Sequence, residues 1–260
     1  LIRARHGVAE SRLRVIPRGV DPRRFDPALV SAERLAALRA AWGVAEGQPI
    51  IMLPARVTRW KGQMVLVEAM AQLPGDALAL LVGDAAERPA FQAELQARIA
   101  GLGLQDRVRL VGHATDMPAA LMLADVVVHA STDAEAFGRT VIEAQAMARP
   151  VIASDLGAPR ETVAEGITGW RTPPGDAAAL AAALSRALAM TDSERAALGA
   201  RARARDGGPE LADRAAGDLA VRRARAPRDG AHRRRDLDRH LDRDDTAAGL
   251  RQRAHGGGGD

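Results

Sequence analysis

The sequence predicts an α/β fold, with a parallel sheet that carries helices on both faces. Between about residues 13 and 190, short runs rich in Val, Ile and Leu alternate with helical patterns, as they do in parallel α/β domains. The runs show little polar–apolar alternation, which is typical of strands buried on both sides. The expected domain is therefore Rossmann-like, and its ligands should bind beyond the carboxyl ends of the strands.

The apolar runs and the helical periodicities define the expected elements. The expected strands are 13–16, 50–53, 77–82, 108–111, 126–129 and 151–153. The expected helices are 61–72, 88–101, 116–123, 138–147 and 160–164. Asp176 is a plausible N-cap of a later helix with Leu180, Leu184 and Leu188 on one stripe. A further helix should open at residue 191 through a capping box closed at residue 194.

Charge is distributed unevenly along the chain. Residues 1–200 carry 22 basic and 22 acidic side chains, whereas residues 201–260 carry 15 arginines against 11 acids and supply the net charge of +4. The basic balance is thus weak evidence for nucleic acid, and the scarcity of aromatics argues against a platform that stacks single-stranded bases. The absence of cysteine excludes disulfides and thiolate metal sites.

Three parts are expected along the chain. Residues 1–12 are expected to be a remnant of an interdomain region, since the chain starts with Leu rather than Met and looks like a piece truncated at its start. Residues 13–205 form the Rossmann-like domain. Residues 206–260 should be a disordered Arg-rich tail, because too few apolar side chains remain to offset the entropy of ordering. A shifted reading frame would explain this tail, and a natural basic tail is the alternative.

Two glutamates, Glu135 and Glu143, bracket the most informative segment. The segment follows the expected strand 126–129 and enters a helix at Gly138, whose N-terminal amides would form a site for phosphate. One carboxylate precedes this anion site and the other lies about a turn and a half into the helix. This arrangement fits a ligand that carries both a phosphate and hydroxyl-rich sugars.

Lysine usage singles out a second position. Lys61 is the single lysine among 36 arginines. Its position indicates a need for a compact ammonium that a planar guanidinium cannot replace. The alternative is one surface lysine that remained by chance.

Several blocks of the chain together form a recognisable set. They are Val15-Ile-Pro-Arg-Gly-Val-Asp21 with Arg24-Phe-Asp-Pro27, Pro54-Ala-Arg-Val-Thr-Arg-Trp-Lys-Gly62, Leu81-Val-Gly-Asp84, the segment from Glu135 to Glu143, and Arg149-Pro-Val-Ile-Ala153 with Gly157-Ala-Pro-Arg-Glu161. In order and spacing they resemble the C-terminal, nucleotide-sugar-binding domain of retaining GT-B glycosyltransferases of family four, over about residues 13–205. The family often has two glycines where this chain has Gly157 and Ala158.

The resemblance implies roles for the charged residues. Arg56 and Lys61 resemble the pair that holds the donor diphosphate and stabilises its developing charge. Glu143 resembles the glutamate that binds the ribose hydroxyls. Glu135 resembles the glutamate beside the transferred sugar, where it favours an oxocarbenium-like transition state; whether it acts as a nucleophile stays open. The alternative is that these four residues are solvated charges without a function, Arg56 and Lys61 in a loop and Glu135 and Glu143 at a helix.

The resemblance also implies a wider donor site. Its further members are Phe137, Gly138, Arg139, Thr140, Asp84 and His113. Asp84 could equally be a turn residue, and His113 could equally be a surface histidine beside the loop expected to flank the nucleobase.

The function implied is a retaining hexosyltransferase that takes its sugar from a UDP-, GDP- or ADP-sugar, with no metal or other cofactor. An acceptor glycan or lipid-linked glycan would bind through a missing N-terminal domain, in the assembly of cell-surface polysaccharide, lipopolysaccharide or glycolipid. The expected location is the cytoplasm, with peripheral association at the inner face of the membrane as an option. The alternatives are a nucleotide-binding or interaction module without catalysis, and another GT-B enzyme such as a sugar-nucleotide epimerase.

Overall fold

The computed structural model describes Gly7 and residues 19–206 of the 260-residue chain. The chain divides into two units, Leu1–Ala220 and Val221–Asp260, and every described residue belongs to the first. The expected strand 13–16 lies outside the described residues. So do the expected N-terminal remnant, apart from Gly7, and the expected tail, apart from Asp206.

Six parallel strands form one sheet in the order β3-β2-β1-β4-β5-β6. They are β1 (Ile50–Pro54), β2 (Leu78–Val82), β3 (Val108–Gly112), β4 (Val126–His129), β5 (Val151–Ser154) and β6 (Trp170–Thr172). This is the doubly wound order, and it confirms the predicted fold class. The order reverses between β1 and β4, which are paired directly. In such sheets a crevice forms at that reversal, outside the carboxyl ends of the strands.

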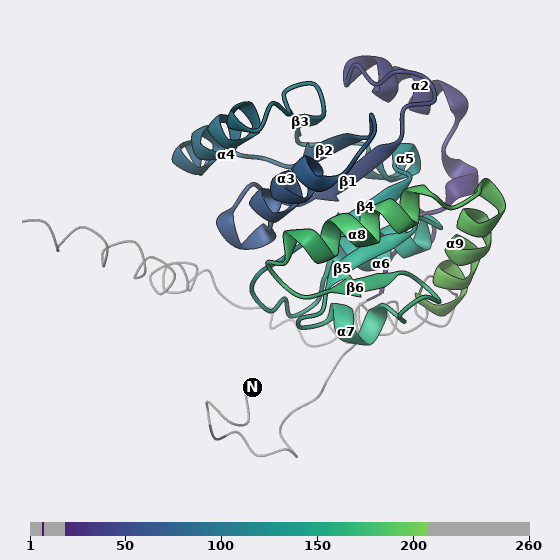
Figure 1. Cartoon of the computed structure of the whole chain (residues 1–260). Helices are drawn as coiled ribbons and strands as arrows, with labels where there is room; N and C mark the ends of the chain where they lie inside the picture. The colour runs from purple at the N-terminus through teal and green to yellow at the C-terminus, as the bar shows by residue number, and fades with distance from the viewer. Residues whose placement is uncertain (1–6, 8–18, 207–260) are drawn as a thin grey trace, which may run out of the picture. The chain divides into compact units, whose positions relative to one another are not determined.

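Helices cover both faces of the sheet. They are η2 (Pro27–Leu29), α2 (Ala32–Ala41), η3 (Arg59–Lys61), α3 (Gln63–Gln72), α4 (Pro89–Gly101), α5 (Met117–Leu123), α6 (Arg139–Ala146), α7 (Pro159–Thr162), α8 (Ala177–Leu188) and α9 (Asp192–Asp206). In Figure 1, α3 and α8 lie in front of the sheet and α6 lies behind it. The right-handed crossovers that parallel strands require place the helices in this way.

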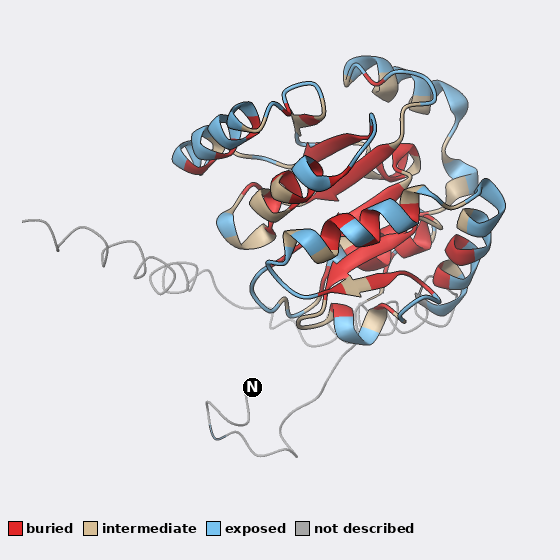
Figure 2. Ribbon diagram, viewed as in Figure 1, coloured by how far each residue is buried: buried red, intermediate tan, exposed pale blue. Residues whose placement is uncertain are grey.

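Alternate residues of the central strand β1 enter two separate cores. Ile51 packs with apolar residues of α3, α4 and α8, whereas Met52 packs with those of α5 and α6. Figure 2 shows the strands as the buried centre of the unit. Burial on both faces is the physical reason for the continuous apolar runs in the sequence.

The predicted helix starts are confirmed where caps were proposed. The side chain of Asp176 accepts a hydrogen bond from the amide of Ala179 at 2.9 Å. Thr191 and Glu194 form the reciprocal capping box: the amide of Thr191 donates to Oε2 of Glu194 at 2.8 Å, and the amide of Glu194 donates to Oγ1 of Thr191 at 3.3 Å. Such caps satisfy amides that have no partner inside the helix.

Besides the short 3-10 helices η2 and η3, two elements are present that the sequence did not predict, β6 and α2. The strand β6 has only three residues, with the half-buried Arg171 at its centre, so it gives no apolar run. The helix α2 has no fully buried residue. Its Leu35 and Leu38 pack half-buried against the core, and the guanidinium of Arg34 binds both oxygens of Asp116, the N-cap of α5, at 2.6 and 2.8 Å. Neither element carries a strong periodic pattern.

Candidate functional site

A cleft of about 750 Å³ opens at the carboxyl edge of the sheet. Its walls come from the loops after β1, β2, β3 and β4 and from the first turns of α6. All ten residues singled out from the sequence line it: Arg56, Lys61, Asp84, His113, Glu135, Phe137, Gly138, Arg139, Thr140 and Glu143. The structure thus brings the whole predicted set into one place, at the reversal of strand order.

The loop after β1 is held tightly against the end of β4. Gly62 has φ +77°, and a Cβ at this position would overlap the carbonyl oxygen of Ala130. Only glycine therefore allows this approach. The fully buried Gln63 donates from Nε2 to the carbonyl oxygen of Arg56 at 2.8 Å. These contacts fix the backbone that carries Arg56 and Lys61.

The carboxylate of Glu135 is held from two sides. Its Oε1 contacts the ammonium of Lys61, and its Oε2 lies 2.7 Å from Nε2 of His129. The hydroxyl of Ser131 lies 3.3 Å from the same His129 nitrogen. Lys61, Glu135 and His129 are largely buried, with side chains 17%, 10% and 5% exposed. Three elements therefore meet at this carboxylate: the loop after β1, the end of β4 and the loop after β4.

Burial tunes the two basic groups beside Glu135. Burial first, and then the positive charge of Arg56, lowers the pKa of Lys61 from 10.5 to about 8. Burial first, and then the charge of Lys61, lowers the pKa of His129 from 6.5 to about 4. At pH 7 Lys61 is therefore charged and His129 is neutral.

The backbone of Glu135 is fixed by the loop after β5. The amide of Ala158 donates to the carbonyl oxygen of Glu135 at 3.0 Å. Gly157 has φ +68°, and a Cβ there would come within 2.6 Å of the same oxygen. Ala158 has helical φ and ψ, so the departure from two glycines leaves the required hydrogen bond in place.

The helix α6 begins at the cleft without a side-chain cap. Gly138 is its N-cap, with φ 64° and ψ 50°, and no side chain bonds to the amides of the first turn. These amides and the helix dipole create a positive potential that suits an anion. The predicted helix start at Gly138 is confirmed to within one residue.

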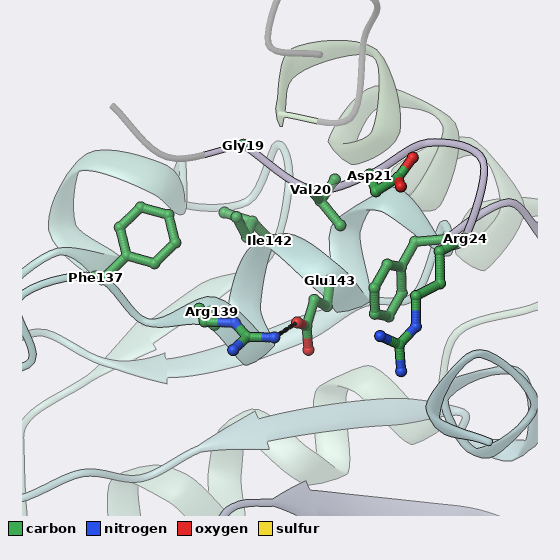
Figure 3. Close-up of a pocket in the computed structure, with 9 residues that line it drawn as sticks. Gly19, Val20, Asp21, Arg24, Phe137, Arg139, Ile142 and Glu143 are labelled. Carbon is green, nitrogen blue, oxygen red and sulfur yellow. Dashed lines mark hydrogen bonds and ion pairs between the residues drawn. The ribbon is translucent and has the colours of Figure 1, made fainter. Parts of the chain in front are cut away.

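The carboxylate of Glu143 lies on the buried side of α6 beside a second hollow. Its Oε1 accepts a hydrogen bond from Nη2 of Arg139 at 2.9 Å, and Figure 3 shows these two side chains pointing toward each other. The hollow has a volume of about 310 Å³ and shares Phe137, Arg139 and Glu143 with the cleft. Arg24 lies on its other side. Glu143 can therefore be approached from two cavities.

Asp84 and His113 lie at the rim of the cleft. The carboxylate of Asp84 accepts from the amide of Ala86 at 2.8 Å, and its carbonyl oxygen accepts from the amide of Val57 at 2.9 Å. Asp84 is therefore a turn residue that also lines the cleft. His113 is exposed in the loop after β3, so it is a surface histidine within reach of a ligand.

The sequence did not point to His129 or Gln63. Both are polar and fully or nearly fully buried, and both hold residues of the predicted set. A polar residue that ends an otherwise apolar strand, six positions before Glu135, was the signal available for His129. Gln63 had no comparable signal, because a glutamine in the first turn of a helix is ordinarily exposed.

The part of the chain that the structure describes holds neither a metal-binding cluster nor a membrane-spanning helix. No group of three or more His, Asp or Glu side chains is arranged to hold a metal ion in residues 19–206. No helix in the same part of the chain is long and apolar enough to cross a bilayer.

The fold and the cleft define a doubly wound α/β domain whose switch point gathers cations, an open helix end and two buried carboxylates. The chain belongs to the family of glycosyl transferases group 1, since the family model matches residues 36–205.

Similar proteins agree with this assignment. A D-inositol 3-phosphate glycosyltransferase of Xylanimonas cellulosilytica is 36% identical over 202 residues, which cover 76% of this chain and 48% of that protein. A glycosyltransferase from Rickettsia africae has a similar structure, with a TM-score of 0.80 and 32% identity over 86% of this chain and 60% of that chain. Anabaena HepE, solved with UDP and glucose, has a TM-score of 0.73 and 30% identity over 83% of this chain and 59% of that chain. The chain spans about half the length of the curated relatives it matches.

Proposed function

We propose that this chain is the donor-binding half of a retaining glycosyltransferase that uses a nucleoside-diphosphate sugar. The observation that carries the proposal is the cleft at the strand reversal, where Lys61 and the open end of α6 lie beside the carboxylates Glu135 and Glu143. The cations suit a diphosphate and the carboxylates suit hydroxyl groups. The UDP and UDP-glucose bound in the HepE structures support the same ligand class.

The proposed chemistry starts with the bond between the anomeric carbon and the diphosphate oxygen. As this bond breaks, its electron pair leaves with the diphosphate, and the anomeric carbon gains positive character. Arg56, Lys61 and the amides of α6 would stabilise the departing charge. Glu135, held in position by its neighbours, would stabilise the charge on the sugar. Cationic side chains and backbone amides supply the positive potential in this scheme, so it assigns no role to a metal or cofactor.

The acceptor would attack the anomeric carbon on the same face of the sugar from which the leaving group departs. Its hydroxyl oxygen forms the new bond to the anomeric carbon, and its proton passes to an oxygen of the leaving diphosphate. Configuration is thereby retained. A covalent intermediate on Glu135 is less well supported, because its partner carboxylate would have to be Glu143, which belongs to the proposed ribose site and is already paired with Arg139.

The biological setting proposed is the assembly of a cell-surface polysaccharide, lipopolysaccharide or glycolipid on the cytoplasmic side of the membrane. The acceptor would bind to a second domain of the full protein, with UDP, GDP or ADP as the nucleotide of the donor. One similar protein is a D-inositol 3-phosphate glycosyltransferase, whose name gives a polyol phosphate. A polyol or glycan hydroxyl is accordingly the acceptor class proposed for this chain.

A thermal-shift series on the full 260-residue chain tests the proposal. UDP, GDP and ADP would each be compared with their nucleosides and with inorganic pyrophosphate. At least one nucleoside diphosphate should raise the Tm at millimolar concentration, by more than either of its parts alone. If none of the three diphosphates stabilises the chain, the proposal is wrong.

A further inference from the structure

His129 occupies a position that neither catalysis by Glu135 nor simple core packing requires. It is the last residue of β4, where its register opposite Ala153 of β5 fixes its backbone. Its imidazole is 5% exposed, and Nε2 is 2.7 Å from Oε2 of Glu135, which lines the cleft. A buried imidazole aimed at a cleft carboxylate therefore needs an explanation of its own.

The contacts of the ring define where its proton lies. A neutral imidazole carries one N–H group, and the carboxylate can only accept. Nδ1 of His129 is buried and makes no hydrogen bond within the described part of the chain. An unpaired acceptor there costs less than an unpaired N–H group would. The proton is therefore on Nε2, which donates to Glu135.

A neutral donor has a specific consequence for Glu135. The titratable groups that face the imidazole are Lys61 and Glu135 itself, with the hydroxyl of Ser131 beside them. Burial and the charge of Lys61 both disfavour the protonated ring. His129 thus orients the carboxylate without cancelling its negative charge.

Lys61 cannot orient the Glu135 carboxylate once the donor is bound. Its ammonium contacts the other oxygen of Glu135, but the same ammonium is the group proposed to meet the donor diphosphate. A doubly charged diphosphate would compete for it. When Lys61 turns toward the phosphate, the remaining side-chain hydrogen bond on Glu135 is the one from His129.

We propose that His129 is a positioning residue, whose Nε2–H group holds the Glu135 carboxylate toward the transferred sugar while Lys61 engages the diphosphate. The inference rests on the proposed function, because it assumes a sugar beside Glu135. It assigns His129 no contact with the ligand. Its effect should therefore appear in recognition of the sugar and not in recognition of the nucleotide.

The test uses the full chain with His129→Gln and His129→Leu. A glutamine amide can place an N–H group near the position of Nε2, whereas leucine fills the space without a donor. Glu135→Gln serves as the reference for loss of the carboxylate. Calorimetry with UDP, GDP and ADP and with their glucose esters gives, for each variant, the ratio between the affinity for the sugar nucleotide and that for the diphosphate.

His129→Leu should reduce this ratio by roughly three- to tenfold, as should Glu135→Gln, the size expected for one lost hydrogen bond. His129→Gln should keep the ratio within about twofold of the parent value, and all variants should bind the diphosphate alone like the parent. An unchanged ratio in His129→Leu overturns the role of His129 while leaving the proposed function intact. A parent chain that binds none of the diphosphates overturns the proposed function instead.

A second readout does not depend on ligand or on the leucine variant folding. In the parent chain, nitrogen-15 NMR should show His129 as the neutral tautomer protonated on Nε2, and Glu135→Gln should shift the resonance of that nitrogen. A ring protonated on Nδ1, or an Nε2 resonance that ignores the change at position 135, contradicts the inference. Either result would show that Nε2 of His129 does not donate a hydrogen bond to Glu135.

Discussion

The ammonium of Lys61 and the carboxylate of Glu135 are in direct contact, although their loops follow different strands. The contact exists because β1 and β4 are neighbours at the point where the strand order reverses. Loops that leave adjacent strands at that point converge around one crevice. The contact between the chain's single lysine and Glu135 therefore depends on the order of the strands as well as on the local sequence.

Affinity for a nucleoside diphosphate should fall at alkaline pH. Lys61 has a pKa of about 8, and only its protonated form attracts the phosphates. Affinity should be nearly constant between pH 7 and pH 7.5, and then decrease by up to about tenfold per pH unit above 8. Calorimetry from pH 7 to pH 9.5 measures this. Lys61→Arg is the matched control: it should bind more weakly than the parent, but its guanidinium stays charged, so the affinity that remains should not change with pH.

Stability toward acid should depend on His129. The pKa of this residue is about 4 in the folded chain, below its ordinary 6.5. Between these values the unfolded state binds the extra proton, so the free energy of unfolding decreases as the pH falls. From pH 7 to pH 5 the parent should lose about 2 kcal/mol more than His129→Gln does. Urea unfolding of both proteins at pH 7 and pH 5 measures this difference. An equal decrease in the free energy of unfolding of the two proteins would count against a neutral buried imidazole.

Gly62 should be far less tolerant of alanine than Gly47. Both have positive φ, +77° and +73°, but a Cβ at Gly62 would overlap the Ala130 carbonyl, whereas nothing lies within 4 Å at Gly47. Gly47→Ala should cost about 1 kcal/mol of stability from backbone strain alone. Gly62→Ala should cost at least about 3 kcal/mol, because the loop and β4 must move apart. Comparable unfolding free energies for the two variants would show that the loop after β1 is not packed as described.

Arg139 should act on nucleoside binding through Glu143. Its guanidinium occupies one oxygen of Glu143 and its side chain is 67% exposed, so ribose hydroxyls must compete with it. Arg139→Ala should change stability by less than about 0.5 kcal/mol and should raise nucleoside affinity about two- to threefold. Calorimetry with the nucleosides measures this change. A large loss of affinity would show instead that Arg139 binds the ligand directly, as the family resemblance implies.

The sequence predicted the sheet well because its strands are buried on both faces. The strands β1 and β2 are apolar throughout, and β4 and β5 are apolar up to a polar last residue. The predicted limits of all four were right to within one or two residues. The strand β6 escaped notice because Arg171 interrupts it, and its place in the sheet depends on pairing with β5. Tertiary pairing of that kind is invisible in a local pattern.

The site was predicted as a set of residues but not as a network. Glu135 and Lys61 stood out from local motifs, and the cleft unites them. The residues that hold them in place, His129 and Gln63, were not predicted. Their hydrogen bonds depend on side-chain geometry that the adjacent sequence does not encode. The hydrogen bond from the amide of Ala158 to the carbonyl oxygen of Glu135 could not be foreseen either, because it depends on how the loop after β5 packs against the loop after β4.

The central claim is that Lys61 meets a diphosphate and Glu143 meets a ribose in one cleft. Calorimetry on Lys61→Ala and Glu143→Gln, each titrated with nucleoside diphosphates and with nucleosides, tests it most directly. Lys61→Ala should weaken the diphosphate by roughly 10- to 150-fold and leave the nucleoside nearly unchanged, whereas Glu143→Gln should weaken both. If both variants bind both ligands like the parent, the cleft is not a donor site.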